Sequence, residues 1–125
     1  MPWPTRRYAR RVARFAYALD LVDDDAAIAA YEEHHRRIWP EVAKALREVG
    51  ITEMNIYRSG SRLFMVFEAK AGFDPDVEFA RYASMPRIDE WEQLMKSNQR
   101  VVPAAANGEW WSRMRMIFAL SDQPK

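Results

Sequence analysis

Residues 51–69, ITEMNIYRSGSRLFMVFEA, predict a β-hairpin in the middle of the chain. Residues 51–58 and 62–69 each favour a strand, and Ser59-Gly60 between them is typical of a tight turn. In the second strand, Leu63 and Met65 alternate with Phe64 and Val66, which is the period of two that strands show. The two strands therefore form an antiparallel pair.

The residues before the hairpin predict one strand followed by a helix in two segments. Large apolar residues alternate with smaller ones across Arg14–Val22, as in a strand. The aspartates at 23–25 suit the N-terminus of a helix over Ala26–His35, where acids meet unpaired N–H groups. Pro40 begins a second helical segment, and Gly50 is a suitable stop for it.

The residues after the hairpin predict two helices and a last strand. We expect helices over Asp76–Ser84 and Ile88–Gln99, and a strand over Trp110–Leu120. The whole order is then βαββαβ, which is the ferredoxin-like plan of the α+β class. It places the helices on one face of an antiparallel sheet.

The other face of this sheet carries large apolar side chains, which a small monomer should not expose. We therefore expect a symmetric homodimer. A small ligand would lie between the paired sheets or between sheet and helices. We expect one domain over residues 14–120, a basic leader over 1–13 and a polar tail over 121–125.

Composition and charge exclude several classes of protein. The 125 residues contain no cysteine, which excludes disulfides and thiolate chemistry and fits a cytoplasmic location. Five of the 19 basic residues are arginines within residues 1–14, which hold no acid. The remaining 14 basic residues stand against 18 acidic ones, so the body is mildly acidic and unlike a nucleic-acid-binding domain.

The basic leader is an ordinary solvated segment in the simplest interpretation, and a tail for nucleic acid or membrane in another. It is not a signal peptide, because no apolar region follows the arginines. No window is long and apolar enough for a membrane span. The four glycines form no phosphate-binding loop, and no serine nucleophile motif occurs.

The two histidines are the main candidates for acid–base chemistry. His34 and His35 are adjacent, so on a helix they point about 100° apart and do not easily share a metal ion. His35 follows Tyr31 by four residues, so the two share one helix face. The plain alternative is a half-buried histidine bonded to backbone or to Tyr31.

Aromatic residues and carboxylates near this histidine fit a sugar pocket, although core packing is the simpler explanation for any single tryptophan. Glu90 and Glu92 flank Trp91 in the predicted helix. They lie on divergent faces, so at most one of them joins the surroundings of Trp91.

The stretch from Tyr31 to Glu41, YEEHHRRIWPE, resembles the Tyr-x-x-x-His-x-x-x-Trp-Pro-Glu signature of the L-rhamnose mutarotase family, which includes L-fucose mutarotases. The similarity continues through Gly50-Ile51, the hairpin and Glu90-Trp91-Glu92. It ends at Trp110-Trp111 and the apolar residues that follow. It covers roughly residues 14–120.

The resemblance implies a ferredoxin-like dimeric α/β barrel that uses no metal and no cofactor. It implies that His35 is the proton donor and that Tyr31 and Trp91 bind substrate. Met54 stands where rhamnose enzymes have a substrate-contacting tyrosine, and Glu92 stands where they have a second tryptophan. L-fucose is therefore the first expected substrate and L-rhamnose the second.

Mutarotation needs a proton on the ring oxygen and loss of the proton on the anomeric hydroxyl. We assign one transfer to His35, whose unperturbed pKa suits neutral pH. Glu92 is the candidate for the other, with Glu68 or a water as alternatives. Tyr57 is expected to line the pocket together with Tyr31. The predicted partners are a sugar and a second copy of the chain, not nucleic acid or membrane.

Two other functions remain open from the sequence. One is a small cofactor-free oxygenase of similar fold, and the other is a non-catalytic binding domain, because fold does not fix function.

Overall fold

The computed structural model describes residues 12–125. The sheet is built from β1 (Val12–Leu21), β2 (Ile51–Ser59), β3 (Arg62–Lys70), β4 (Gln99–Arg100) and β5 (Ser112–Met114). The helices are α2 (Asp25–Arg36), α3 (Pro40–Glu48), α4 (Pro75–Ala83) and α5 (Ile88–Lys96), and a short 3-10 turn, η1, covers Leu120–Asp122. Within residues 12–125, no helix is both long and apolar enough to cross a bilayer.

The sheet has the strand order β2-β3-β1-β4, with β5 also paired to β1, and every pairing is antiparallel. The longest strand, β1, lies in the middle, and its register with β3 runs from Val12 opposite Lys70 to Asp20 opposite Arg62. The predicted hairpin is confirmed, since Ser59 pairs with Arg62 across the turn. The α+β class and the ferredoxin-like plan are confirmed as well.

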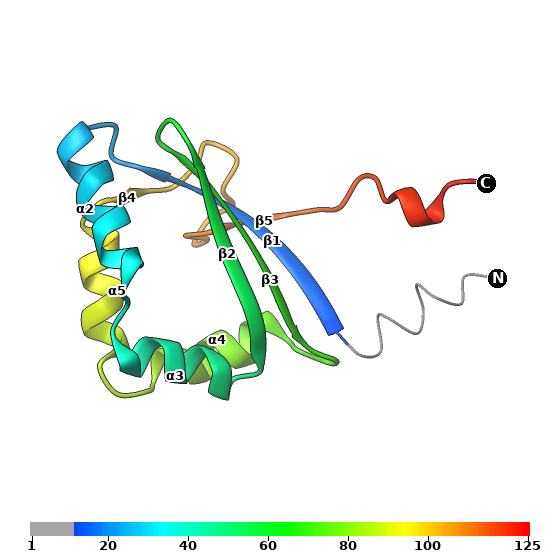
Figure 1. The fold of residues 1–125 in the computed structure, drawn as a ribbon, viewed down its shortest axis with the longest axis horizontal. Helices are drawn as coiled ribbons and strands as arrows, with labels where there is room; N and C mark the ends of the chain where they lie inside the picture. The colour runs from blue at the N-terminus through cyan, green and yellow to red at the C-terminus, as the bar shows by residue number, and fades with distance from the viewer. Residues whose placement is uncertain (1–11) are drawn as a thin grey trace.

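The helices gather on one face of the sheet, as predicted, and the C-terminal segment leaves on the other side (Figure 1). Alternation along the strands decides this arrangement, because every second residue of a strand points to the helices. The buried residues of β1 and β3, including Leu19, Leu63 and Phe67, face them. They pack against the apolar side of each helix, for example Val42 of α3 and Ile88 of α5.

The predicted helix boundaries are confirmed at the ends that have a local cause. Asp24 is the N-cap of α2, where its carboxylate accepts a hydrogen bond of 3.0 Å from the Ala27 backbone N–H. Pro40 occupies the first turn of α3. Gly50 follows α3 with a φ of +104°, and a Cβ there would lie 2.7 Å from the Lys70 side chain.

The C-terminal part differs from the prediction in two places. The last predicted helix, Ile88–Gln99, ends at Lys96, and Gln99 belongs instead to β4. The predicted strand over Trp110–Leu120 is reduced to Ser112–Met114, which pair with Ala18 to Ala16 of β1. The alternating pattern of residues 115–120 finds no neighbouring strand in residues 12–125, and without a partner an extended segment is not a strand.

The chain makes a long excursion between β4 and β5. Arg100 pairs with Asp20 and Ser112 pairs with Ala18. The 11 residues 101–111 between them therefore lie outside the sheet, whereas β1 has only Leu19 between the two pairing positions. This excursion brings Trp110 back against Gln99.

The sheet of the single chain is open and does not close into a barrel. A dimeric barrel therefore requires a second copy. Residues 1–11 of the predicted leader lie outside the described residues, and Val12 and Ala13 begin β1, two residues before the strand start predicted at Arg14.

Candidate active site

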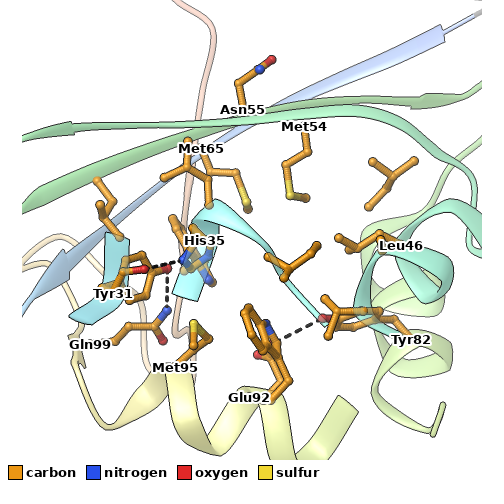
Figure 2. Close-up of a pocket in the computed structure, with 18 of the residues that line it drawn as sticks. Tyr31, His35, Leu46, Met54, Asn55, Met65, Tyr82, Glu92, Met95 and Gln99 are labelled. Carbon is orange, nitrogen blue, oxygen red and sulfur yellow. Dashed lines mark hydrogen bonds between the residues drawn. The ribbon is translucent and has the colours of Figure 1, made fainter. Parts of the chain in front are cut away.

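A cavity of about 1060 Å³ lies between the sheet and the helices, which is one of the two positions that the sequence suggested. Its floor comes from β2 and β3, through residues such as Met54 and Met65, and its walls come from all four helices (Figure 2). All six residues proposed from the sequence line it, namely Tyr31, His35, Met54, Tyr57, Trp91 and Glu92. Tyr82 and Gln99, which the sequence did not single out, line it as well.

His35 projects from the last turn of α2 into this cavity. Its Nδ1 lies 2.9 Å from the backbone carbonyl oxygen of Tyr31. A carbonyl oxygen only accepts, so Nδ1 carries the hydrogen and, in the neutral ring, Nε2 carries a free lone pair. Burial lowers the pKa of His35, partly offset by this backbone hydrogen bond. His35 is therefore a neutral base at neutral pH.

Tyr31 is fully inside the protein and is held by a chain of hydrogen bonds. Its hydroxyl accepts from Gln99 Nε2 at 3.1 Å, and Gln99 Oε1 accepts from Trp110 Nε1 at 2.8 Å. Burial raises the pKa of Tyr31 to about 12, so its hydroxyl keeps its proton. The tyrosine and the histidine rings lie 4.3 Å apart between centroids, which confirms the shared helix face expected from their spacing.

Trp91 forms an apolar wall beside the histidine. Its ring meets His35 edge-on with centroids 5.7 Å apart, and Trp39 meets it from another side at 5.3 Å. Trp91 is buried, so it contributes to the core as well as to the cavity. His34 lies farther out, with its ring centroid 6.5 Å from Trp91, and it does not line the cavity.

Glu92 supplies a carboxyl group to the cavity, whereas Glu90 is exposed and pairs with Arg87. This agrees with the divergent directions expected of the two glutamates. Tyr82 of α4 donates a hydrogen bond of 3.3 Å to Glu92 Oε2. Burial raises the pKa of Glu92, while the Tyr82 hydrogen bond and the positive charge of Lys96 act in the opposite direction. Glu92 thus holds its proton to higher pH than an exposed glutamate.

Two other candidates lie away from these groups. Tyr57 borders the cavity, but its side chain alternates with the inward-facing residues of β2, is 60% exposed and packs near Phe64. Asn55, on the same side of β2, points away from the cavity in Figure 2. Glu68 forms an ion pair with Arg14 and does not line the cavity, so it is not placed to exchange protons with His35's ligand.

The sequence did not single out Gln99 or Tyr82. Gln99 was assigned to a helix end, and nothing local marks it as a partner of Tyr31, 68 residues earlier. Tyr82 follows the apolar pattern of α4 and is separated from Glu92 by a turn between two helices. A buried carboxyl group needs a polar partner, and this requirement is the one signal in the sequence that points to a donor near Glu92. Among residues 12–125, no three metal-binding side chains cluster.

The chain matches the L-rhamnose mutarotase family over residues 14–120. It belongs to that family. Members of the family are isomerases that act on carbohydrates, and both the predicted family and the predicted class of enzyme are confirmed. The reaction of the family, interconversion of sugar anomers, fits a cavity in which a histidine and a carboxyl group lie beside aromatic side chains.

Individual relatives agree with this assignment. The chain is 47% identical to an L-fucose mutarotase of Xanthomonas campestris pv. campestris over 111 residues, which cover 87% of this chain and 89% of that protein. It is 34% identical to an L-rhamnose mutarotase of Acidiphilium cryptum over 99 residues, 78% of this chain and 89% of that one. The crystal structure of an L-rhamnose mutarotase from Formosa agariphila has the same fold, with a TM-score of 0.63 at 21% identity, over 86% of this chain and 98% of that one.

Proposed function

We propose that this member of the family interconverts the α and β anomers of L-fucose, with L-rhamnose as the second candidate. The observation that carries the proposal is the pairing, in one cavity, of a neutral histidine and a buried carboxyl group, His35 and Glu92. Their environments move the two pKa values in opposite directions, so one group is suited to accept a proton and the other to donate one.

His35 acts first as the base. Its free Nε2 accepts the proton of the anomeric hydroxyl, while Nδ1–H stays bonded to the carbonyl of Tyr31. As C1 becomes an aldehyde, the bond between C1 and the ring oxygen breaks. When the ring closes again, His35 returns its proton to the aldehyde oxygen, which is the donor role that the family resemblance implied.

Glu92 supplies the second proton. In its protonated form, the carboxyl group gives its proton to the leaving ring oxygen and takes it back when that hydroxyl attacks C1. Tyr82 donates to Oε2, so the proton belongs on Oε1. Rotation about the C1–C2 bond between opening and closing exchanges the faces of C1, and both proton transfers then run in reverse. No group is consumed, as an isomerisation requires.

The remaining candidates hold the sugar. Trp91 offers an aromatic face to the apolar C–H groups of the sugar, and Tyr31 binds one of its oxygens. Met54 lies in the cavity floor, and Tyr57 borders its mouth. L-fucose stands first because the relative that is 47% identical carries that name and because Met54 and Glu92 replace two aromatic residues of rhamnose enzymes. We assign these roles to the domain of residues 14–120.

Proton NMR with selective saturation of one anomeric signal tests the proposal on L-fucose, L-rhamnose and D-glucose in parallel. Transfer of saturation to the other anomer, in proportion to protein concentration, would establish the reaction and rank the sugars. Background exchange with all three sugars contradicts the proposal, and saturable sugar binding in the same samples would then favour the non-catalytic binding domain.

We further propose that the protein is a cytoplasmic homodimer. The sheet face opposite the helices carries Phe64 and Met114, which are 37% and 46% exposed. The segment that follows β5 extends away from the body (Figure 1) and exposes Met116, Ile117, Phe118 and Leu120. A second copy that covers both the face and the segment would remove this apolar surface from water. The absence of cysteine supports the location.

A further inference from the structure

Trp110 determines which groups donate and which accept in the hydrogen bonds that link it to Gln99 and Tyr31. An indole N–H only donates, so the Gln99 atom 2.8 Å from Trp110 Nε1 must be the amide oxygen. An amide alone could face either way, but Trp110 leaves one orientation. The Gln99 NH2 group therefore faces the Tyr31 hydroxyl at 3.1 Å.

An NH2 group also only donates, so the Tyr31 oxygen accepts this bond. The hydroxyl hydrogen must then point elsewhere. Among residues 12–125, Gln99 is the one hydrogen-bond partner that the structure gives to the Tyr31 hydroxyl. Tyr31 is 3% exposed and lines the cavity, so a ligand in the cavity is the available acceptor.

We propose that Gln99, held in one orientation by Trp110, is a positioning residue that makes the Tyr31 hydroxyl a hydrogen-bond donor to an oxygen of the bound sugar. This inference rests on the proposed function, in which Tyr31 binds the sugar. Gln99 of β4 lines the cavity beside Tyr31, and Trp110, near the end of the excursion before β5, holds the amide of Gln99.

The backbone and the side chain of Tyr31 serve different partners. Its backbone carbonyl accepts a hydrogen bond from His35, whereas its hydroxyl accepts one from Gln99. Loss of Gln99 therefore affects sugar binding more than the acid–base step. A substitution that only damaged the fold would instead lower the apparent kcat together with thermal stability.

Gln99→Glu keeps a hydrogen bond between residue 99 and the Tyr31 hydroxyl but allows its direction to reverse with pH. A carboxyl group at 99 still accepts from Trp110 through one oxygen. When protonated, its other oxygen can donate to Tyr31 as the amide does. When ionised it can only accept, so the Tyr31 hydroxyl turns toward it and away from the sugar.

The experiment measures KM and kcat for L-fucose anomer exchange by saturation-transfer NMR from pH 6 to pH 9, in wild type, Gln99→Glu, Gln99→Met and Trp110→Phe. In Gln99→Glu we expect KM to rise with pH by roughly tenfold relative to wild type, the value of one neutral hydrogen bond, with kcat changed less. Glu92 titrates in both proteins and both carry Lys96, so the comparison with wild type removes the effect of these two groups.

Gln99→Met should raise KM at every pH, and Trp110→Phe should raise it by a smaller factor because the amide becomes free to turn. The matched control is Gln93→Met, the same change at an exposed position of α5, with KM expected to equal that of wild type. Unchanged KM in all three site variants, beside an active wild type, overturns this inference alone. No exchange by wild type with any 6-deoxy sugar overturns the proposed function and the inference with it.

Discussion

His35 Nδ1 lies 2.9 Å from the backbone carbonyl oxygen of Tyr31, one helical turn earlier in α2. This contact fixes the tautomer of the imidazole, because the carbonyl can only accept. It also fixes where the reactive nitrogen points, since the ring is bonded at one end and faces the cavity with the other. The backbone contact thus sets the tautomer and the orientation of the base before any sugar binds, and burial keeps the ring neutral.

Replacement of His35 by alanine should lower kcat for anomer exchange by roughly 10²–10⁴-fold, the usual contribution of general acid–base catalysis. The saturation-transfer rate at saturating sugar measures it. His34→Ala is the matched control, because the neighbouring histidine does not line the cavity and its loss should leave kcat close to wild type. An equal effect of the two substitutions would contradict the assignment of the base.

The pH profile of kcat/KM should have an acid limb set by His35 and an alkaline limb set by Glu92. Protonation of His35 removes the base, and since burial lowers its pKa, the acid limb should lie below pH 6.5. Ionisation of Glu92 removes the acid, so the rate should fall again at higher pH. Glu92→Gln should lower the rate and abolish this alkaline limb while the acid limb remains. An alkaline limb that persists in Glu92→Gln would show that another group donates the proton.

Tyr82→Phe should move the alkaline limb to higher pH. The Tyr82 hydroxyl donates to Glu92 and stabilises the ionised carboxylate, which holds the Glu92 pKa down against the effect of burial. Loss of the donor should therefore raise the pKa of Glu92 further. Tyr17→Phe removes a buried tyrosine hydroxyl outside the cavity and should leave the limb in place. A shift to lower pH in Tyr82→Phe would refute the argument.

Substrate preference should follow two positions of the cavity. Met54→Tyr combined with Glu92→Trp introduces the aromatic residues that the family resemblance implies at these positions in rhamnose enzymes. We expect the ratio of kcat/KM for L-fucose over L-rhamnose to fall in the double variant, even as its overall rate drops through loss of Glu92. Competition between the two sugars in one NMR sample measures that ratio. Met85→Tyr, a methionine outside the cavity lining, should leave the ratio unchanged.

Removal of residues 115–125 should weaken the homodimer. The deleted segment includes Ile117, which is 87% exposed in the single chain and has no partner strand among residues 12–125. Light scattering coupled to gel filtration measures the mass of full-length and shortened protein at several concentrations. A full-length monomer at all concentrations would contradict the proposed dimer. The double substitution Ile117→Ser and Phe118→Ser tests the same segment without shortening the chain.

Much of the fold was available from local patterns. Alternation identified the three long strands, and Asp24, Pro40 and Gly50 marked helix ends through capping chemistry that acts within a few residues. The last strand was overestimated because alternation reports which residues suit a strand and not whether a partner strand is present. Residues 115–120 have the pattern and lack the partner.

Sequence by itself determined the hairpin, the shared face of Tyr31 and His35 and the divergence of Glu90 from Glu92, because these follow from the repeat of a strand or a helix. Only the tertiary structure decided which groups meet from distant elements. Gln99 reaches Tyr31 across 68 residues, and Tyr82 meets Glu92 across the α4–α5 turn. The direction of each hydrogen bond, and with it the state of each group in the cavity, depends on those meetings, and no local period encodes them.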